Sequence, residues 1–372
     1  MKKLKVMTIL GTRPEIIRLS EVIKRCDACF DHVVAHTGQN YDYTLNQIFF
    51  DELGLHSPDF YMNAVGTHLG ETLGNIISRS YELLCEEKPD AVLILGDTNS
   101  ALSAISAKRL KIPIFHMEAG NRCFDANLPE ELNRRIVDHT SDINLCYSEH
   151  ARRHLISEGL RHEYIFVTGS PMIEVLTRNQ SAIEASNVLD ELKLEPNKFI
   201  LLSAHREENI DLEENFFSLM NAINEMAEVY NMPVIYSMHP RSENFINQRR
   251  FKFHSNVQSM KPFGFHAYCK LQKSAFCVVS DSGTLPEETS FYGFPGVSIR
   301  TSTERPEAMD KGRFVLGGID TKSLLQSVEL VTMSRNFAPV PDYTDINVSD
   351  KVVGIIQSYT SVVNQRIWRK PV

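Results

Sequence analysis

The chain has 372 residues, and at roughly 150 residues per domain this length predicts two domains. Its 47 Asp and Glu residues outnumber its 39 Lys and Arg residues, so the formal net charge is −8 and nucleic acid is disfavoured as a partner. No apolar run reaches the roughly 18 residues of a membrane helix, and the seven scattered cysteines fit reduced thiols better than a disulfide framework. The composition therefore predicts a cytoplasmic protein that contacts neither nucleic acid nor membrane.

Short apolar runs alternate with segments of helical period from one end of the chain to the other. Helices are predicted at 69–86, 100–110 and 130–139 and, near the C-terminus, at 348–367. The predicted strands form two sets: 4–10, 33–36, 91–95, 112–116, 143–146 and 165–167 in the first, and 199–203, 234–238, 276–280 and 296–299 in the second. This alternation predicts an α/β protein with two doubly wound parallel sheets.

The strand pattern stops near residue 170 and restarts at 199 after a polar segment. We therefore predict an N-terminal Rossmann-like domain at 1–170, a C-terminal Rossmann-like domain at 171–350, and a C-terminal helix at 351–372 that packs back on the N-terminal domain. Doubly wound sheets bind ligands outside the carboxyl ends of their strands. A cleft between two facing domains is accordingly the expected site.

The first predicted strand is followed by Gly11-Thr12-Arg13-Pro14-Glu15, a turn that leads into a helix. Arg13 at the start of that helix favours an anion, because the helix N-terminus itself carries partial positive charge. The alternative is a well-capped turn whose arginine is only solvated. Neither the dinucleotide fingerprint GxGxxG nor the P-loop GxxxxGK[ST] follows, and no cofactor is predicted.

Acidic residues stand after the later strands of the first domain, at Asp97, Glu118 and Glu130. A carboxylate directly after an apolar strand is partly desolvated, which suits a general acid or base. Simpler interpretations exist, with Asp97 as a helix cap and Glu130 as a charge that complements a helix dipole. The occurrence of these three acidic residues on neighbouring elements favours a common acid–base site.

The second domain carries polar residues at equivalent strand ends. His205 follows its first strand and is interpreted as a site residue, with a structural histidine as the alternative. Ser282 and Gly283 follow its third predicted strand, where small residues at a helix start form an anion-binding turn. No HExxH or paired CxxC motif occurs, so no metal site is predicted, and the spacing in Cys26-Asp27-Ala28-Cys29 is interpreted as incidental.

Taken in order, these motifs resemble those of the non-hydrolysing UDP-N-acetylglucosamine 2-epimerase family, whose fold is the two-domain GT-B type. The resemblance spans nearly the whole chain and rests on this ordered set: Gly11-Thr12-Arg13-Pro14-Glu15, Gly96-Asp97-Thr98, Glu118-Ala119-Gly120, Pro129-Glu130-Glu131, Asn133-Arg134, His205-Arg206-Glu207, Asp281-Ser282-Gly283 and Thr303-Glu304-Arg305-Pro306-Glu307-Ala308. It implies a homodimer that inverts carbon 2 of a UDP-sugar without a cofactor, by eliminating UDP to form a 2-acetamido-glycal and then adding it back.

The resemblance also implies roles for individual residues. It assigns acid–base catalysis to Asp97, Glu118 and Glu130, and assistance at the leaving phosphate to His205. Which carboxylate acts on which face of the sugar stays open. Glu288 is expected at the ribose hydroxyls, and Arg18 stands where many members of the family have lysine. The full set of implied UDP contacts is Arg13, Arg18, His239, Ser282, Gly283, Glu288 and Arg305.

Three stretches, at 36–43, 120–125 and 261–265, are more similar to one branch of the family. That branch converts UDP-2-acetamido-2,6-dideoxy-L-talose to UDP-N-acetyl-L-fucosamine for capsule or O-antigen polysaccharide. The 6-deoxy sugar carries a methyl group, and Phe124 is a candidate for an apolar contact with it, a packed loop side chain being the alternative. Gln39-Asn40-Tyr41-Asp42 replaces the Gln-His-Arg motif that helps many bacterial members bind a regulatory UDP-N-acetylglucosamine, which puts this activation in question.

Three other functions stay open. The first is the parent reaction, which interconverts UDP-N-acetylglucosamine and UDP-N-acetylmannosamine. The second is a glycosyltransferase with the GT-B fold, which needs an acceptor and exchanges no carbon-2 proton. The third is a non-catalytic nucleotide-sugar sensor, which the carboxylates argue against, because binding of UDP does not require acids near an anion.

Overall fold

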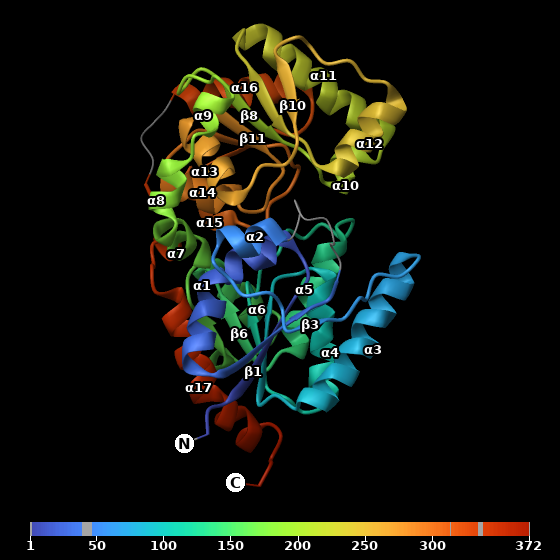
Figure 1. Cartoon of the computed structure of the whole chain (residues 1–372), viewed down its shortest axis with the longest axis vertical. Helices are drawn as coiled ribbons and strands as arrows, with labels where there is room; N and C mark the ends of the chain where they lie inside the picture. The colour runs from blue at the N-terminus through green and yellow to red at the C-terminus, as the bar shows by residue number, and fades with distance from the viewer. Residues whose placement is uncertain (1, 39–46, 313, 334–337, 372) are drawn as a thin grey trace. The chain divides into compact units, whose positions relative to one another are not determined.

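The computed structural model of the chain describes residues 2–38, 47–312, 314–333 and 338–371 (Figure 1). The chain forms two compact units. The first comprises Met1–Thr177 together with Asp342–Val372, and the second comprises Arg178–Pro341. The sequence predicts domain boundaries at 170 and 350. In the structure the first unit extends a few residues further, to Thr177, and the C-terminal segment that belongs to it starts earlier, at Asp342.

In the part of the chain that the structure describes, the first unit contains a parallel sheet in the order β3-β2-β1-β4-β5-β6-β7. Helices lie on both faces of this sheet (Figure 1), and all residues of β4 are buried. Burial on both faces explains why such strands stand out in the sequence as unbroken apolar runs. The strands are β1 (Lys5–Leu10), β2 (Asp31–His36), β3 (Phe60–Tyr61), β4 (Ala91–Leu95), β5 (Ile114–Met117), β6 (Ile143–Cys146) and β7 (Ile165–Val167).

Helices connect the successive strands of the first unit, as parallel pairing requires. Proline in the first turn favours the start of α1 and α5. Helix α17 packs against α1 and buries Val352, Ile356 and Val363. The helices are α1 (Arg13–Cys29), α2 (Gln47–Glu52), α3 (Leu69–Glu87), α4 (Ser103–Arg109), α5 (Pro129–Thr140), α6 (Glu149–Ser157), α7 (Pro171–Arg178) and α17 (Val348–Arg366), with short 3-10 segments η2 (Asn99–Leu102), η3 (His162–Tyr164) and η4 (Pro341–Tyr343).

The described residues of the second unit repeat this architecture, with a parallel sheet in the order β10-β9-β8-β11-β12-β13. Its core includes Phe216, Leu219 and Ile223 of α11, all fully buried. The strands are β8 (Ile200–Ser203), β9 (Val234–Ser237), β10 (Val257–Met260), β11 (Cys277–Ser280), β12 (Gly296–Ser298) and β13 (Val315–Leu316). The helices are α8 (Gln180–Ala185), α9 (Val188–Glu191), α10 (Glu207–Ile210), α11 (Glu213–Tyr230), α12 (Pro240–Arg249), α13 (Phe265–Ser274), α14 (Leu285–Tyr292), α15 (Pro306–Met309) and α16 (Thr321–Met333).

The predicted α/β class with two doubly wound parallel sheets is confirmed. Every predicted strand is present; β4, β6 and β7 have the predicted bounds, and the ends of the others differ by one or two residues. Three further strands were not predictable from apolar runs, because β3, β10 and β13 lie at sheet edges and are only partly buried. The predicted helix at 100–110 is divided into η2 and α4.

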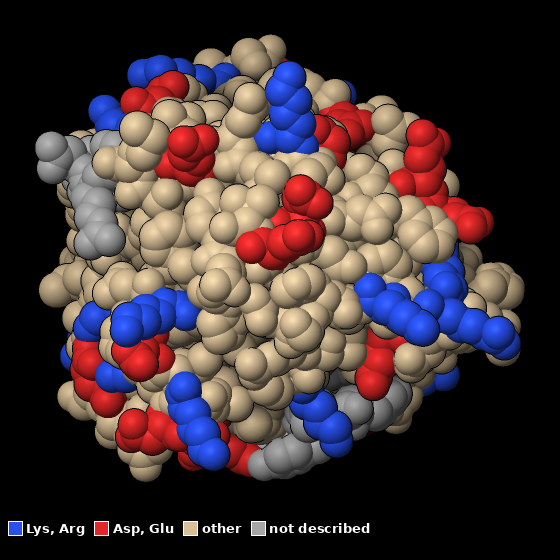
Figure 2. Space-filling model, turned by 90° about the horizontal axis from the view of Figure 1, so that it is seen from above, with Lys and Arg blue, Asp and Glu red and all other residues tan. Residues whose placement is uncertain are grey.

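The charged surface residues and the cysteines are arranged as the composition predicts. Figure 2 shows Lys and Arg side chains interspersed with Asp and Glu side chains over one face of the molecule. All seven cysteines are free thiols. Among the described residues, no helix combines the length and the apolar character that a membrane crossing requires.

Candidate active site

Each sheet has a point at which its strand order reverses, between β1 and β4 in the first unit and between β8 and β11 in the second. The carboxyl ends of the strands at such a reversal are the usual ligand-binding position of an open α/β sheet. Arg13 and Asp97 follow β1 and β4, and His205 and Ser282 follow β8 and β11. The topology therefore brings sequence-predicted residues to the binding edge of each unit.

Glu118 follows β5 in a left-handed backbone conformation, with φ of +64°. Its Oε2 accepts a hydrogen bond from Arg18 Nη1 in an ion pair whose two side chains are 6% and 8% exposed. Its Oε1 accepts a 3.3 Å bond from Asn121 Nδ2. A guanidinium stabilises the ionised form of a carboxyl group, which is the form that a general base needs. Arg18 is thus the partner of Glu118, and its implied contact with UDP stays a prediction.

Asp97 follows β4 and is held by α5. Arg134 approaches Asp97 Oδ2 through Nε at 2.8 Å and Nη2 at 2.7 Å. Asn133 Nδ2 donates to the Asp97 carbonyl oxygen at 2.9 Å. Glu130 lies half-buried in the first turn of the same helix, and among the described residues no hydrogen bond or ion pair joins it to Asp97 or Glu118.

Glu15 is a buried carboxyl group that sequence reasoning missed as a candidate. Its Oε2 accepts bonds from Gly11 N at 3.1 Å and Thr12 Oγ1 at 2.7 Å, and its Oε1 contacts Ser100 Oγ. Burial raises its pKa to about 7, although these hydrogen bonds act in the opposite direction. Glu15 therefore joins the loop after β1 to the loop after β4 and titrates near neutral pH.

Because the folded pKa of Glu15 lies above its unfolded value of 4.5, the stability that this residue gives is full below pH 4.5 and is lost as the pH rises through about 7. We expect the free energy of unfolding to fall by about 3 kcal/mol over this range on account of Glu15. The Glu15→Gln variant mimics the protonated form and should lack this slope. Urea unfolding at pH 5 to 8 measures the difference, with exposed Glu86→Gln as control; equal slopes in all three proteins would contradict the assignment.

Gly120, two residues after Glu118, has φ of +82°. A Cβ atom built on it would lie 2.3 Å from the Ala151 carbonyl oxygen, so only glycine fits. Its N–H donates to both carboxylate oxygens of Asp138 at 3.2 Å. Asp138 also accepts a 2.7 Å bond from the fully buried Arg122. This network fixes the backbone that carries Glu118.

The Gly120→Ala variant is expected to lose about 3 kcal/mol of unfolding free energy, because it combines backbone strain with a clash against Ala151. Gly159→Ala is the matched control, since Gly159 has φ of +88° but no atom within 4 Å of its added Cβ. That control should cost only about 1 kcal/mol. Thermal and urea unfolding measure both values, and equal losses would show that the contact with Ala151 is unimportant.

Arg13 is the first residue of α1, and its guanidinium carbon lies 5.7 Å from the centre of the Phe49 ring. The side chain is half-buried at the carboxyl edge of the first sheet. This position suits an anion at the helix N-terminus. The contact with UDP itself stays a prediction.

His205 in the second unit is oriented by the fully buried Asp281. Its Nδ1 lies 3.0 Å from Asp281 Oδ1, and the backbone N–H groups of His205 and Arg206 donate to Asp281 Oδ2 at 2.8 and 2.9 Å. Burial acts to raise the pKa of Asp281, but His205 and these backbone donors hold it well below its ordinary value. An ionised Asp281 keeps a proton on Nδ1 and presents Nε2 of His205 to a ligand.

The turn after β11 forms a network of hydroxyl groups. Ser282 Oγ lies 2.9 Å from Thr284 Oγ1, and Thr284 Oγ1 donates to Glu288 Oε1 at 3.0 Å. Gln272 Nε2 donates to the other oxygen of Glu288 at 2.6 Å. The buried Glu288 thus faces the same turn as Ser282 and Gly283, as a shared site requires.

The two remaining predicted contacts differ in accessibility. His239 is half-buried, and the centre of its ring lies 5.7 Å from that of His205, at the same sheet edge. Arg305 is completely buried, with Nη2 3.7 Å from Glu287 Oε2. This burial favours packing of the α14 region over direct contact with a ligand, so the assignment of Arg305 stays a prediction.

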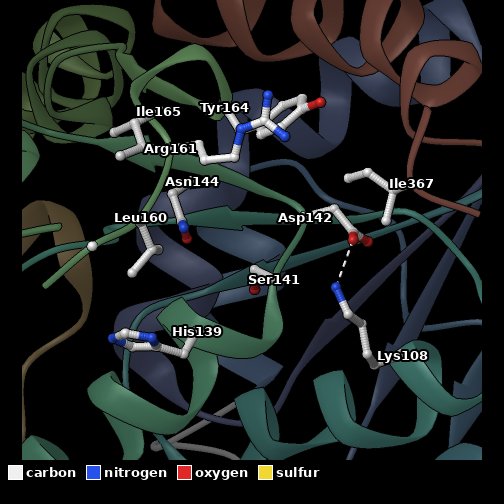
Figure 3. Close-up of a pocket in the computed structure, with 11 residues that line it drawn as sticks. Lys108, His139, Ser141, Asp142, Asn144, Leu160, Arg161, Tyr164, Ile165 and Ile367 are labelled. Atoms are coloured by element: carbon white, nitrogen blue, oxygen red, sulfur yellow. Dashed lines mark hydrogen bonds and ion pairs between the residues drawn. The ribbon is translucent and has the colours of Figure 1, made fainter. Parts of the chain in front are cut away.

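A cavity in the first unit lies at the amino ends of β6 and β7, and Figure 3 shows the residues that line it. Its volume is about 320 Å³. Its lining includes Arg161 and the ion pair between Lys108 Nζ and Asp142 Oδ1, 2.6 Å apart. None of the residues assigned to catalysis lines it, because they stand at the carboxyl edge.

The segment Gln39-Asn40-Tyr41-Asp42, which differs from the Gln-His-Arg motif of many bacterial members, lies outside the described residues. Its effect on regulation stays a prediction.

Comparison with known proteins gives a consistent result. The chain matches the family described as UDP-N-acetylglucosamine 2-epimerase over residues 24–357. A structure of UDP-N-acetylglucosamine 2-epimerase from Rickettsia bellii has 44% identity and a TM-score of 0.92, covering 99% of this chain and 100% of that one. The structure of Methanocaldococcus jannaschii UDP-GlcNAc 2-epimerase in complex with UDP-GlcNAc and UDP has 32% identity and a TM-score of 0.90. The match covers 95% of this chain and 99% of that one. The UDP-2,3-diacetamido-2,3-dideoxy-D-glucuronate 2-epimerase of Pseudomonas aeruginosa is 32% identical over 87% of this chain and 91% of its own length.

The two α/β units and the matches across them define the class of this protein, an isomerase of the UDP-sugar 2-epimerase type. The chain belongs to the UDP-N-acetylglucosamine 2-epimerase family. The sugars named for its relatives differ, so membership of the family does not by itself specify the sugar.

Proposed function

We propose that this protein inverts carbon 2 of UDP-2-acetamido-2,6-dideoxy-L-talose to give UDP-N-acetyl-L-fucosamine, for capsule or O-antigen polysaccharide. The observation that carries the epimerase chemistry is the buried ion pair between Glu118, directly after β5, and Arg18 of α1. The choice of the deoxy sugar is supported by the similarity at 120–125 and by Phe124, which is 68% exposed in the loop after β5.

The carbon-2 proton of such a sugar is not acidic, because no carbonyl group adjoins that carbon. In the proposed elimination, a base takes this proton and the C–H electron pair forms the double bond of the glycal between carbons 1 and 2. The bond from carbon 1 to the UDP oxygen breaks, and UDP keeps that electron pair. Return of UDP to carbon 1, with a proton added to the opposite face of carbon 2, completes the inversion without net oxidation.

The proposed roles follow the surroundings of each group. Glu118 is the base at carbon 2, since its guanidinium partner favours the carboxylate. Asp97 and Glu130 complete the acid–base set, and Glu130 is the member with no ion pair among the described residues. His205 assists the departing diphosphate as an imidazolium whose Nε2–H faces the phosphate, because the Asp281 carboxylate beside Nδ1 orients the ring and stabilises its positive charge.

The test is incubation of the purified enzyme with each UDP-sugar separately in deuterated water, followed by NMR. We expect conversion of the L-talo substrate with deuterium incorporated at carbon 2. Turnover of UDP-N-acetylglucosamine but not of the L-talo sugar would refute the substrate and leave the epimerase chemistry standing. Turnover without deuterium at carbon 2 would refute the epimerase chemistry and favour a GT-B glycosyltransferase.

A second candidate is the interconversion of UDP-N-acetylglucosamine and UDP-N-acetylmannosamine. It is favoured by the name of the Rickettsia bellii relative, which is 44% identical. The two candidates use the same catalytic groups, but one substrate has the L-talo and the other the D-gluco configuration, and at carbon 6 the deoxy sugar has a methyl group and the other a hydroxymethyl group. The side chains around the sugar ring, including those near carbon 6, therefore decide between them.

Phe124→Ala is expected to raise KM for the deoxy substrate about tenfold and to change kcat little, because the contact with the methyl group is lost equally in the ground and transition states. Phe124 packs edge-on against His154, with ring centres 5.4 Å apart, and remains accessible. Leu330→Ala, an exposed apolar residue on α16, is the control. An unchanged KM in Phe124→Ala would remove this side chain from the sugar site.

Two further properties stay predictions within this proposal. A homodimer is expected from the family resemblance, and sedimentation of the purified protein measures it. A cytoplasmic location is expected from the composition, and cell fractionation tests it.

A further inference from the structure

Three potential metal ligands converge at the amino edge of the first sheet, away from the carboxyl edge that carries Glu118. Asp27 lies near the end of α1, His32 is the second residue of β2, and His56 follows α2. One ligand atom from each of the three lies within 4.8 Å of the others. We propose that Asp27, His32 and His56 form a binding site for a divalent transition metal ion, with Zn²⁺ as the best match.

The distances in this cluster suit a small ion. Asp27 Oδ1 lies 3.4 Å from His56 Nε2 and 2.5 Å from His32 Nδ1. Two ligands of a tetrahedral Zn²⁺ are about 3.3 Å apart, given metal–ligand distances of about 2.0–2.1 Å. The pair of Asp27 and His56 already has this separation. The contact between Asp27 and His32 has to open by less than about 1 Å, and the Asp27 side chain, 35% exposed, has room to turn.

Both imidazole rings are fixed through their other nitrogen. His32 Nε2 lies 2.8 Å from Thr8 Oγ1, and His56 Nδ1 lies 2.7 Å from the Ser57 carbonyl oxygen. A carbonyl oxygen only accepts, so His56 carries its proton on Nδ1 and, when neutral, turns the lone pair of Nε2 toward Asp27. Histidines that bind metals are held in this way by an outer hydrogen bond to oxygen. In the metal-free protein a second proton, on Nε2, satisfies this contact, and a metal ion at the same position would replace that proton.

The donor set and its surroundings indicate which ion fits. Two imidazoles and one carboxylate suit Zn²⁺, whereas Mg²⁺ and Ca²⁺ prefer oxygen ligands alone. His32 is 1% exposed and His56 is 42% exposed, so the ion would enter from the solvent side and keep a water ligand. A bound ion would tie α1, β2 and the loop after α2 together.

The experiment uses the untagged full-length protein, freed of metal with EDTA. Calorimetric titration with ZnCl₂ is expected to show one ion per chain, and the ion should raise Tm. Co²⁺ should give the visible bands of a tetrahedral site without a thiolate charge-transfer band. His56→Ala and Asp27→Asn should each lower the affinity by about tenfold or more, and His162→Ala, which removes an exposed histidine outside the cluster, should not.

Outcomes that overturn the proposal are equally specific. The proposal is wrong if the protein does not bind Zn²⁺, if His56→Ala and Asp27→Asn both bind it as tightly as the wild type, or if Cys29→Ser loses the binding. Thr8→Val keeps the shape of a buried side chain and removes the outer bond to His32, so it should weaken binding while one ion per chain remains. Thermal unfolding of each metal-free variant verifies that lost binding is not lost folding.

Discussion

Glu118→Gln is expected to abolish epimerisation, lowering kcat by about 10³-fold, while the affinity for UDP stays nearly unchanged. Glutamine has the size of glutamate and tolerates the left-handed backbone equally, but it cannot accept a proton. The amide still contacts Asn121, so the loop after β5 keeps its hydrogen bond. Deuterium exchange at carbon 2 measures the chemistry, and calorimetry measures UDP binding.

Glu86→Gln, an exposed replacement on α3, is the matched control and should be fully active. Asp97→Asn and Glu130→Gln should resemble Glu118→Gln if all three groups belong to the acid–base set. A parallel loss of UDP affinity in Glu118→Gln would contradict its role as a base. It would indicate instead that Arg18, released from its ion pair, reorganises the nucleotide site.

Asp281→Asn is expected to lower kcat by about 10³-fold through His205, which it orients. The amide oxygen still accepts from the backbone N–H groups of His205 and Arg206, but its NH₂ group then faces His205 Nδ1. A donor at this position moves the ring proton to Nε2 and removes the charge that stabilises an imidazolium. The loss should therefore appear in kcat with KM nearly unchanged, an effect that a merely structural role would not produce.

Stability measurements separate this positioning role from simple unfolding. The folded pKa of Asp281 lies below its unfolded value of 3.8, so the stability given by the carboxylate is complete above pH 3.8 and is lost as the pH falls through the folded value. The wild-type advantage over Asp281→Asn should shrink in that acid range. Glu214→Gln, exposed on α11, is the control. Unchanged kcat in a folded Asp281→Asn protein would exclude the orientation of His205 as a catalytic requirement.

The residues of the candidate site could be predicted from sequence where an ionisable side chain follows a buried strand. Asp97, Glu118 and His205 each follow a buried apolar strand, and parallel strands bring their carboxyl ends to one edge. Glu15 escaped this reasoning because its burial depends on Ser100, which comes 85 residues later. The cluster of Asp27, His32 and His56 escaped for a related reason, since its spacing matches no familiar metal motif and only the tertiary structure brings His56, which follows α2, against the other two residues.

The sequence by itself determined the α/β class, the positions of the buried strands along the chain and the residues at their ends, because apolar periodicity and turn residues act locally along the chain. The tertiary structure decided which of those residues meet. It paired Arg18 with Glu118 across 100 residues and buried Arg305 completely, neither of which any sequence pattern indicated. The physical reason is that ion pairs and desolvation depend on distances between elements, and these are set when the sheet and its helices pack.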